Sequence, residues 1–204
     1  MLNNTFEIVY LAFFIAGSVA RAVGVAKGKK WWRKKSEVVE NRRTGAEKLF
    51  LFFSFLGMQV IPFIYIFSCW LDFADYNLPM GISRILGWSG CIVFAAAIWV
   101  LWRSHVDLGR NFSPELKIRE EHKLVTDGIF HTIRHPMYSA HWLWALAQAM
   151  LLQNWIAGWS MLVAFWPLYS NRVTREEYMM CDIFGDEYRN YMGKTGRIFP
   201  RLTK

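Results

Sequence analysis

The chain has 204 residues, of which 54% are hydrophobic and 17% aromatic, and its formal net charge is +8. This is too apolar for an ordinary soluble domain of this length, so the composition favours one compact integral membrane domain. The positive charge alone would suit nucleic-acid binding, but the basic residues cluster beside apolar runs, which favours contact with a membrane surface instead. Cys69, Cys91 and Cys181 lack metal-ligand spacing, so we expect free thiols and no metal site.

Three apolar runs in the amino-terminal half predict membrane-spanning helices, at residues 6–24, 49–71 and 85–102. The first lacks a basic leader and a small-residue cleavage site, so we expect an anchor rather than a removable signal peptide. The second carries no charge, and we expect Pro62 to kink it. Glycine and alanine in the third favour close helix packing.

A fourth apolar run, 136–171, contains no acid, Lys or Arg, and His141 is its one ionisable imidazole. As a single helix it would reach about 54 Å, which is too long for one span. A break at "LLQNW" (151–155) predicts a hairpin of two helices, 137–152 and 155–172, the second bent near Pro167. We therefore predict an all-α fold with five membrane helices in one domain, 1–204, divided into a three-helix part (1–102) and a polar part (103–204) that contains hairpin 136–172.

The charges of the loops predict the orientation. Segment 21–48 contains ten Lys and Arg against three acids, whereas segment 72–84 contains one Arg and two Asp. The positive-inside rule places 21–48 in the cytoplasm and the N-terminus outside. Segments 103–135 and 172–204 then also face the cytoplasm. Because they hold four of the five histidines and most of the remaining charge, we expect a functional site there.

Two local patterns give this site its candidate residues. Pro136 excludes His135 from helical geometry and suits a first helical turn, so the hairpin should begin there with free N–H groups that suit a carboxylate. Arg172 and Glu176 share a helical face; they form either a surface ion pair of little energetic value or a pair that binds two different ligands. We expect His141 to be a packed helix histidine, and the Trp and Phe of 142–166 to face lipid or core.

The order of the motifs carries a family resemblance. "HKLVTDGIFHTIRHPMY" (122–138) is followed by a helical hairpin and by "RVTREEYMMCDIFGDEYRNYMGKTGRIFP" (172–200). This order, over about 103–201, resembles the C-terminal half of the isoprenylcysteine carboxyl methyltransferase family. The amino-terminal half resembles the short five-helix prokaryotic members in hydropathy and topology alone. Phospholipid N-methyltransferases and membrane-bound thiol methyltransferases share the same region more loosely.

The resemblance implies a cytoplasmic binding region for S-adenosylmethionine and methyl esterification of an isoprenylated cysteine or a similar lipophilic carboxylate, with membrane lipids as the surroundings and no nucleic-acid or metal partner. Arg172 matches the arginine that holds the substrate carboxylate, and it and Glu176 are the expected catalytic pair. The implied donor contacts are Glu115, His122, Lys123, Leu124, Val125, Phe130, His135, Pro136, Met137, Tyr138 and Glu176.

The chain departs from the family pattern at three positions. Family members differ widely at Glu115, Phe130 replaces a common tyrosine, and Thr174 stands where a proline often occurs. Two other functions stay open at this point: methylation of a phospholipid amine or a small thiol by the same donor, and a non-catalytic membrane role. An amine acceptor would need a base, and Arg172 would be ill suited beside it.

Overall fold

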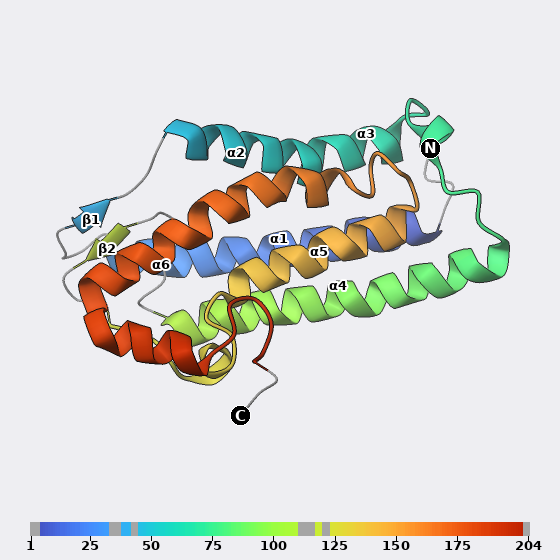
Figure 1. Cartoon of the computed structure of the whole chain (residues 1–204). Coiled ribbons are helices and arrows are strands. Elements are labelled where there is room, and N and C mark those ends of the chain that lie inside the picture. The colour runs from blue at the N-terminus through green and yellow to red at the C-terminus, as the bar shows by residue number, and fades with distance from the viewer. Residues whose placement is uncertain (1–4, 33–37, 42–44, 110–116, 120–122, 202–204) are drawn as a thin grey trace.

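The computed structural model describes residues 5–32, 38–41, 45–109, 117–119 and 123–201. Long helices dominate these residues, and they run along one common direction (Figure 1). The main elements are α1 (Thr5–Trp32), β1 (Val38–Asn41), α2 (Gly45–Phe55), a π-helical segment (Leu56–Val60), α3 (Ile61–Phe67), α4 (Met80–Leu108), β2 (Lys117–Arg119), α5 (Pro136–Leu152) and α6 (Ser160–Lys194). Short 3-10 turns occur at Asp72–Ala74 and Gly128–His131.

Three helical stretches among the described residues are long and apolar enough to cross a membrane: Thr5–Gly28, Gly45–Phe67 and Met80–Leu108. They match the three spans expected in the amino-terminal half. Their outer faces expose large apolar side chains such as Phe52, Trp88 and Ile92, which water would disfavour and lipid accommodates. The protein is therefore an integral membrane protein built mainly of helices.

The second span contains the expected irregularity around Pro62. Proline has no N–H to donate to the carbonyl four residues earlier, and a π-helical segment directly precedes α3. The Met58 carbonyl instead accepts a hydrogen bond from the Tyr10 hydroxyl at 3.4 Å, and the Gly57 carbonyl accepts one from the Gln148 amide at 3.1 Å. Neighbouring helices thus satisfy the carbonyls that the irregular turn releases, as a lipid-embedded helix requires.

The hairpin differs in part from its prediction. α5 begins at Pro136, as expected, and ends at Leu152, after which Gln153 adopts a left-handed conformation with φ 48°. The expected start of the next helix at 155 is wrong, because the Asn154 side chain accepts hydrogen bonds from the N–H groups of Ile156 and Ala157 and holds a turn. α6 starts at Ser160 and continues to Lys194, and non-helical backbone angles inside it occur at Gly185 rather than near Pro167.

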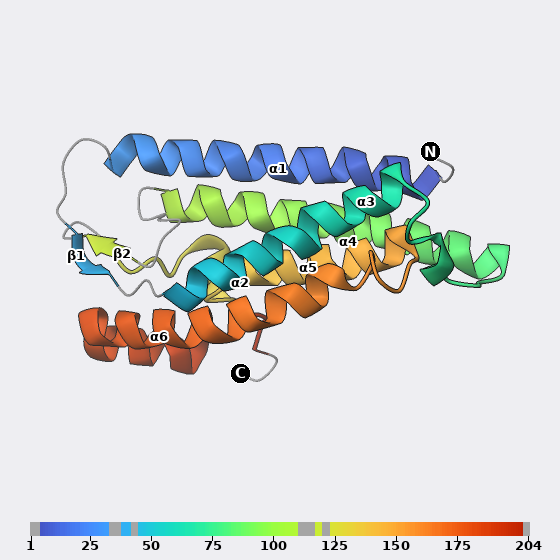
Figure 2. The ribbon, with the colours of Figure 1, turned by 90° about the horizontal axis from the view of Figure 1, so that it is seen from above.

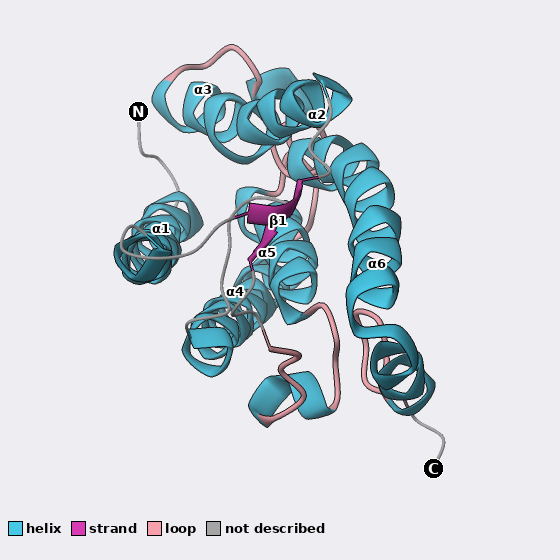
Figure 3. Cartoon of the chain, turned by 90° about the vertical axis from the view of Figure 1, so that its left-hand side faces the viewer, coloured by secondary structure: helices cyan, strands magenta, loops and turns pink. Residues whose placement is uncertain are grey.

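A small sheet is the other departure from the all-α prediction. β1 and β2 pair antiparallel, with Val38 opposite Arg119 and Asn41 opposite Lys117. The sheet joins the segment after α1 to the segment after α4, and it lies across one end of the bundle (Figures 1 and 3). The segments expected to face the same side of the membrane therefore lie at the same end of the molecule.

Helix α5 occupies the centre of the bundle, surrounded by α1, α2 with α3, α4 and α6 (Figure 3). α1 and α4 run side by side along one flank (Figure 2). Small residues allow these close approaches: Ala97 and Ala145 are fully buried, and a Cβ at Gly17 would overlap the Trp144 indole. The expected close packing of the third span is confirmed, and it leaves the first turn of α5 at the same end as the sheet.

Candidate functional site at the mouth of the hairpin

The local sequence places His135 at the start of α5. His135 is the N-cap with φ −125° and ψ 58°, and Pro136 occupies the first helical turn. The backbone N–H groups of Arg134 and His135 donate to the carbonyls of Gly196 and Arg197, at 2.9 and 3.0 Å. The carboxyl-terminal segment is thereby held against the entrance of the hairpin, and it brings the end of α6 beside the Arg-His pair.

Glu177 is the buried centre of this contact. Its carboxylate accepts hydrogen bonds from Arg134 Nε at 2.8 Å and from Arg197 Nε at 3.1 Å, and it lies 3.3 Å from His135 Nε2. Burial alone would raise the pKa of the Glu177 carboxyl, but hydrogen bonds from His135, Arg197 and Arg134 outweigh it and lower the pKa to about 2. Glu177 is therefore a structural anion that orients the two residues before Pro136.

Glu176 faces the other side of the same imidazole. Tyr138 donates its hydroxyl to Glu176 at 2.7 Å, and His135 Nδ1 lies 3.5 Å from the second carboxylate oxygen. Burial opposes ionisation of Glu176, but the His135 hydrogen bond and the Arg172 charge lower its pKa overall. Conversely, burial would lower the pKa of His135, and the two carboxylates raise it. Both ring nitrogens of His135 thus face acceptors, which suits an imidazolium.

Arg172 joins this group from one turn earlier on α6. Its Nε lies 3.3 Å from Glu176, and its terminal nitrogen lies 3.5 Å from Glu47 in the first turn of α2. The Glu47 side chain is 3% exposed and the Arg172 side chain 14% exposed, so a buried carboxylate lies beside a partly buried guanidinium. The ion-pair interpretation of Arg172 and Glu176 is confirmed as a contact, but Arg172 divides its charge between two carboxylates. We call His135, Tyr138, Arg172, Glu176 and Glu177 the mouth cluster.

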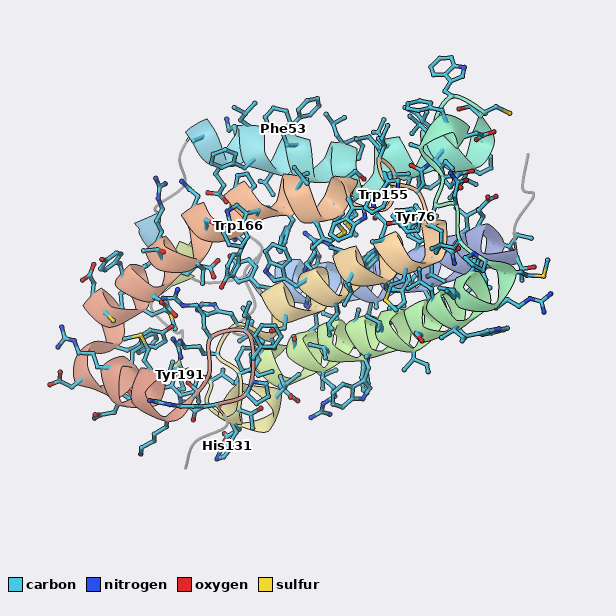
Figure 4. The ribbon with its side chains drawn as sticks, turned by 45° about the vertical axis from the view of Figure 1, so that its right-hand side comes forward. Phe53, Tyr76, His131, Trp155, Trp166 and Tyr191 are labelled. Atoms are coloured by element: carbon cyan, nitrogen blue, oxygen red, sulfur yellow. The ribbon has the colours of Figure 1, made fainter. Side chains whose placement is uncertain are left out.

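Aromatic rings cover the membrane side of the mouth cluster. Tyr138 and Trp142 lie edge-on to Tyr169, with ring centroids 5.5 and 5.6 Å apart, and Phe165 packs beside them. Trp144 lies in the core and Trp166 points outward from α6 (Figure 4), so the Trp and Phe residues of 142–166 divide between core and lipid face as expected. The rings provide an apolar wall with electron-rich faces, which suits a positively charged ligand.

Other candidates from the sequence are more dispersed. Glu115 and His122 lie outside the described residues, Lys123 is exposed, and Leu124 and Val125 are half-buried. Phe130 is buried, and its carbonyl accepts a hydrogen bond from Tyr191, which lies at the same end of the molecule as His131 (Figure 4). The Met137 carbonyl contacts His141. No group of three or more His, Cys, Asp or Glu in the described part of the chain is placed to hold a metal ion, and all three cysteines are free.

Sequence reasoning missed Glu47, Glu177 and Arg197. Glu177 is adjacent to Glu176, so an Arg-x-x-x-Glu-Glu pattern shows two acids without showing which one is buried. Glu47 appears as one of three acids in a basic segment, and its one visible signal is its position two residues before a long uncharged span. Their partners lie in other segments of the chain, just before α5, on α6 and in the carboxyl-terminal segment.

The fold and the site define a helical integral membrane protein with a charged, buried cluster at one end of the bundle. Residues 88–182 match the model of the Isoprenylcysteine carboxyl methyltransferase (ICMT) family. This match confirms the family resemblance that the motifs predict.

Individual relatives agree with the match. The chain is 38% identical over 99 residues to Protein-S-isoprenylcysteine O-methyltransferase of Schizosaccharomyces pombe, covering 48% of this chain and 42% of that protein. It is 35% identical over 88 residues to Protein-S-isoprenylcysteine O-methyltransferase B of Arabidopsis thaliana, covering 42% of this chain and 45% of that protein. The human Protein-S-isoprenylcysteine O-methyltransferase is 26% identical over 129 residues, covering 61% of this chain and 45% of that protein. The matched part spans less than half the length of each of these three relatives.

A solved structure shares the fold across nearly the whole chain. It is described as the eukaryotic intramembrane Ras methyltransferase ICMT without a monobody, and the two structures superpose with a TM-score of 0.59. The sequence identity is 18%, and the superposition covers 98% of this chain and 70% of that chain. The likeness therefore extends to the amino-terminal helices, where the sequence motifs do not reach.

Proposed function

We propose that the protein is an S-adenosylmethionine-dependent membrane methyltransferase that esterifies the carboxylate of an isoprenylated cysteine or a similar amphipathic acid. The names of the relatives support this reaction, since they are isoprenylcysteine O-methyltransferases. The observation that carries the proposal is the position of Arg172 between Glu176 and Glu47 at the mouth of the hairpin. A guanidinium there can bind an acceptor carboxylate, while Glu176 remains anionic beside it.

The residues around Glu176 fit a cationic methyl donor. S-adenosylmethionine supplies an electrophilic methyl group on a positively charged sulfonium. Glu176 provides a counter-charge, and the faces of Tyr138 and Tyr169 provide cation–π contact. The N-terminus of α5, which begins with Pro136, presents the positive end of a helix dipole to the donor's carboxylate.

The reaction requires positioning more than acid–base chemistry. The acceptor carboxylate is already ionised at neutral pH, so no residue has to remove a proton. A carboxylate oxygen forms a bond to the methyl carbon as the carbon–sulfur bond breaks, and the bonding electron pair leaves with the sulfur as a neutral thioether. Opposite charges disappear together, so a site walled by Tyr138, Trp142 and Phe165 with little water favours the reaction over bulk water.

We also propose five membrane spans, consisting of the three apolar stretches, α5 and the first part of α6, with the N-terminus outside. Pairing of β1 with β2 supports a common side for the segments that follow α1 and α4, and the charge of 21–48 supports the cytoplasm as that side. Single cysteines at positions 30 and 203 should resist a membrane-impermeant thiol reagent in sealed cells. Labelling of either position from outside would refute this orientation.

The activity is tested by methyl transfer from radiolabelled S-adenosylmethionine to a panel of acceptors in detergent. We expect transfer to N-acetyl-S-farnesyl-cysteine and no transfer to its methyl ester. Transfer to phosphatidylethanolamine or to a small thiol instead would replace the proposed acceptor while retaining the donor. Absence of both donor binding and transfer would support a non-catalytic membrane role.

A further inference from the structure

Arg21 is a charged residue within the first candidate span, Thr5–Gly28. Ionisable residues inside membrane helices commonly belong to functional sites, although an arginine near the end of a span can also extend to lipid headgroups. Arg21 does not extend away from the bundle. Its terminal nitrogen lies 2.7 Å from Nε2 of His141 on α5, which joins α1 to the central helix near its mouth.

The protonation state of His141 follows from its second contact. Nδ1 lies 2.7 Å from the Met137 carbonyl, which is an acceptor alone, so Nδ1 must carry the proton. Nε2 of the neutral ring is then free to accept from Arg21. Phe165 stacks on the imidazole with centroids 5.4 Å apart and fixes its plane. The expectation of a packed helix histidine is thus correct for the ring, but the ring also positions the Arg21 guanidinium without neutralising it.

A second guanidinium lies near the same imidazole. Arg172 lies 3.3 Å from Glu176, which accepts the Tyr138 hydroxyl at 2.7 Å. Tyr138 is one helical turn before His141 on α5, and both of their rings pack against Phe165. Two positive charges held near one another at the edge of an apolar bundle repel. Glu47 and Glu176 contact Arg172, whereas a terminal nitrogen of Arg21 contacts a neutral ring. An anion between the two arginines would relieve their repulsion.

We propose that Arg21 and Arg172 together bind the acceptor's carboxylate, with Arg21 approaching from α1 and Arg172 from α6. This inference rests on the proposed function and deepens it by assigning a second substrate-binding residue and a basis for selecting the acid. A carboxylate offers two oxygens with lone pairs for two separate guanidinium groups. After methyl transfer the product is a neutral ester, so the attraction disappears, the two arginines repel again, and product release is favoured.

The inference is tested by binding rather than turnover, with purified protein in zwitterionic nanodiscs. The probes are N-acetyl-S-farnesyl-cysteine and its methyl ester, which share one lipid tail and differ in charge. In Arg21→Gln we expect the acid to bind about 10- to 100-fold more weakly, as for loss of a charge-assisted hydrogen bond, with the ester and S-adenosylmethionine affinities unchanged. His141→Phe keeps the stacked ring and loses the acceptor nitrogen, so it should weaken acid binding in the same direction but less.

Lys27→Gln is the matched control, since Lys27 is another exposed cation of α1 and lies about 120° around the helix from Arg21. It should leave the affinities for both probes unchanged. Arg21→Lys keeps the charge without the planar fork and should fall between wild type and Arg21→Gln.

Several results would overturn the assignment. Equal weakening of acid and ester binding in Arg21→Gln would indicate a structural role, and unchanged acid affinity would exclude the contact. If Arg21→Gln instead reduced a preference for phosphatidylglycerol nanodiscs, with acid binding intact, the anion would be a lipid phosphate. Equal binding of the acid and the ester to the wild-type protein would also refute the proposal that Arg21 and Arg172 bind the carboxylate. Acid-selective binding without methyl transfer would contradict the proposed function and leave this inference standing.

Discussion

The two ends of the bundle both gather polar groups, but in different chemical states. At the turn end, formed by residues 68–79 and 153–159, a neutral side chain joins the segments: the Asn154 amide donates to the Leu71 carbonyl and the Asp75 carboxylate and accepts from two N–H groups of its own turn. The rings of Tyr76 and Trp155 pack there at a tilt of 59°, with centroids 4.8 Å apart (Figure 4). At the mouth end, charged groups contact charged groups, and Glu177 alone is approached by two arginines and a histidine.

This difference shows which polar cluster indicates a functional site. Backbone groups in a membrane protein must be satisfied wherever a helix ends, so neutral hydrogen bonds at the turn end have a structural explanation. Buried ion pairs have a high desolvation cost and give little net stability over apolar packing, so a cluster of them requires another explanation. Binding of charged ligands would explain why the mouth cluster contains buried charges.

The largest effect is expected when the central charge of the mouth end is removed. Glu177→Gln leaves Arg134 without its buried counter-charge and His135 with one carboxylate instead of two, and we expect a loss of about 3–5 kcal/mol in the free energy of unfolding. The change at the turn end is Asn154→Ala, which should cost about 1–3 kcal/mol for polar groups left unpaired. Denaturation in detergent gives both values, and donor affinity should fall in Glu177→Gln alone. Equal donor affinities in the two variants would remove the distinction between the ends.

Substitutions of Arg172 and Glu176 sharpen the comparison within the mouth end. Arg172→Ala should lower kcat/KM for the acid acceptor by about 100-fold while donor affinity stays near wild type, because its proposed ligand is the acceptor. Glu176→Ala should raise the KM for S-adenosylmethionine. The control is Arg189→Ala, which breaks an exposed pair with Asp186 on the same helix and should change little.

A charge exchange at the same two positions separates ligand binding from mutual pairing. Arg172→Glu combined with Glu176→Arg retains an ion pair across one helical turn, but it reverses the charges that the donor and acceptor meet. We expect this double variant to fold and to remain inactive. Recovery of methyl transfer would show that the two residues only pair with each other.

Two tyrosine substitutions test a single hydroxyl at each end. Tyr138→Phe removes the 2.7 Å hydrogen bond to Glu176 and should weaken S-adenosylmethionine binding by about 10-fold. Tyr76→Phe removes the hydroxyl that accepts from the Trp159 indole at 2.6 Å, and it should leave donor binding unchanged. Isothermal titration calorimetry on both folded variants compares them directly, and an unchanged affinity in Tyr138→Phe would remove Tyr138 from the donor site.

The smallest effect is expected in the pH dependence of stability. The raised pKa of His135 means that its stabilising contribution is complete below about pH 6.5 and is lost as pH rises through the folded-state value. The lowered pKa of Glu177 gives a contribution present above about pH 4.3 and lost as pH falls toward 2. The free energy of unfolding should therefore decline above pH 6.5 by at most about 1.4 kcal/mol per pH unit. His135→Gln should abolish that decline, and an unchanged slope would contradict the assignment.

The first residues of the site could be predicted from local chemistry, whereas the contacts between distant segments could not. Pro136 excludes its predecessor from helical geometry, so the start of α5 follows from two adjacent residues. The uncharged run before Arg172 indicated a hairpin, but the first residue of α6 depends on Asn154, whose side chain also contacts the segment before α4. Neither the pairing of Glu47 with Arg172 nor the pairing of β1 with β2 leaves a local pattern, because each joins segments that are far apart in the chain.

The π-helical segment before α3 has a consequence for how the protein assembles during synthesis. When the second span enters the membrane, the released carbonyl of Met58 can already meet Tyr10 of the first span. The Gly57 carbonyl must wait for Gln148, which is synthesised 91 residues later. An unpaired carbonyl in hydrocarbon costs several kcal/mol, so the second span is incompletely satisfied until α5 inserts. Arrival of the central helix thus satisfies the Gly57 carbonyl and delivers His135 and Tyr138 in the same step, whereas Arg172, Glu176 and Glu177 follow with α6.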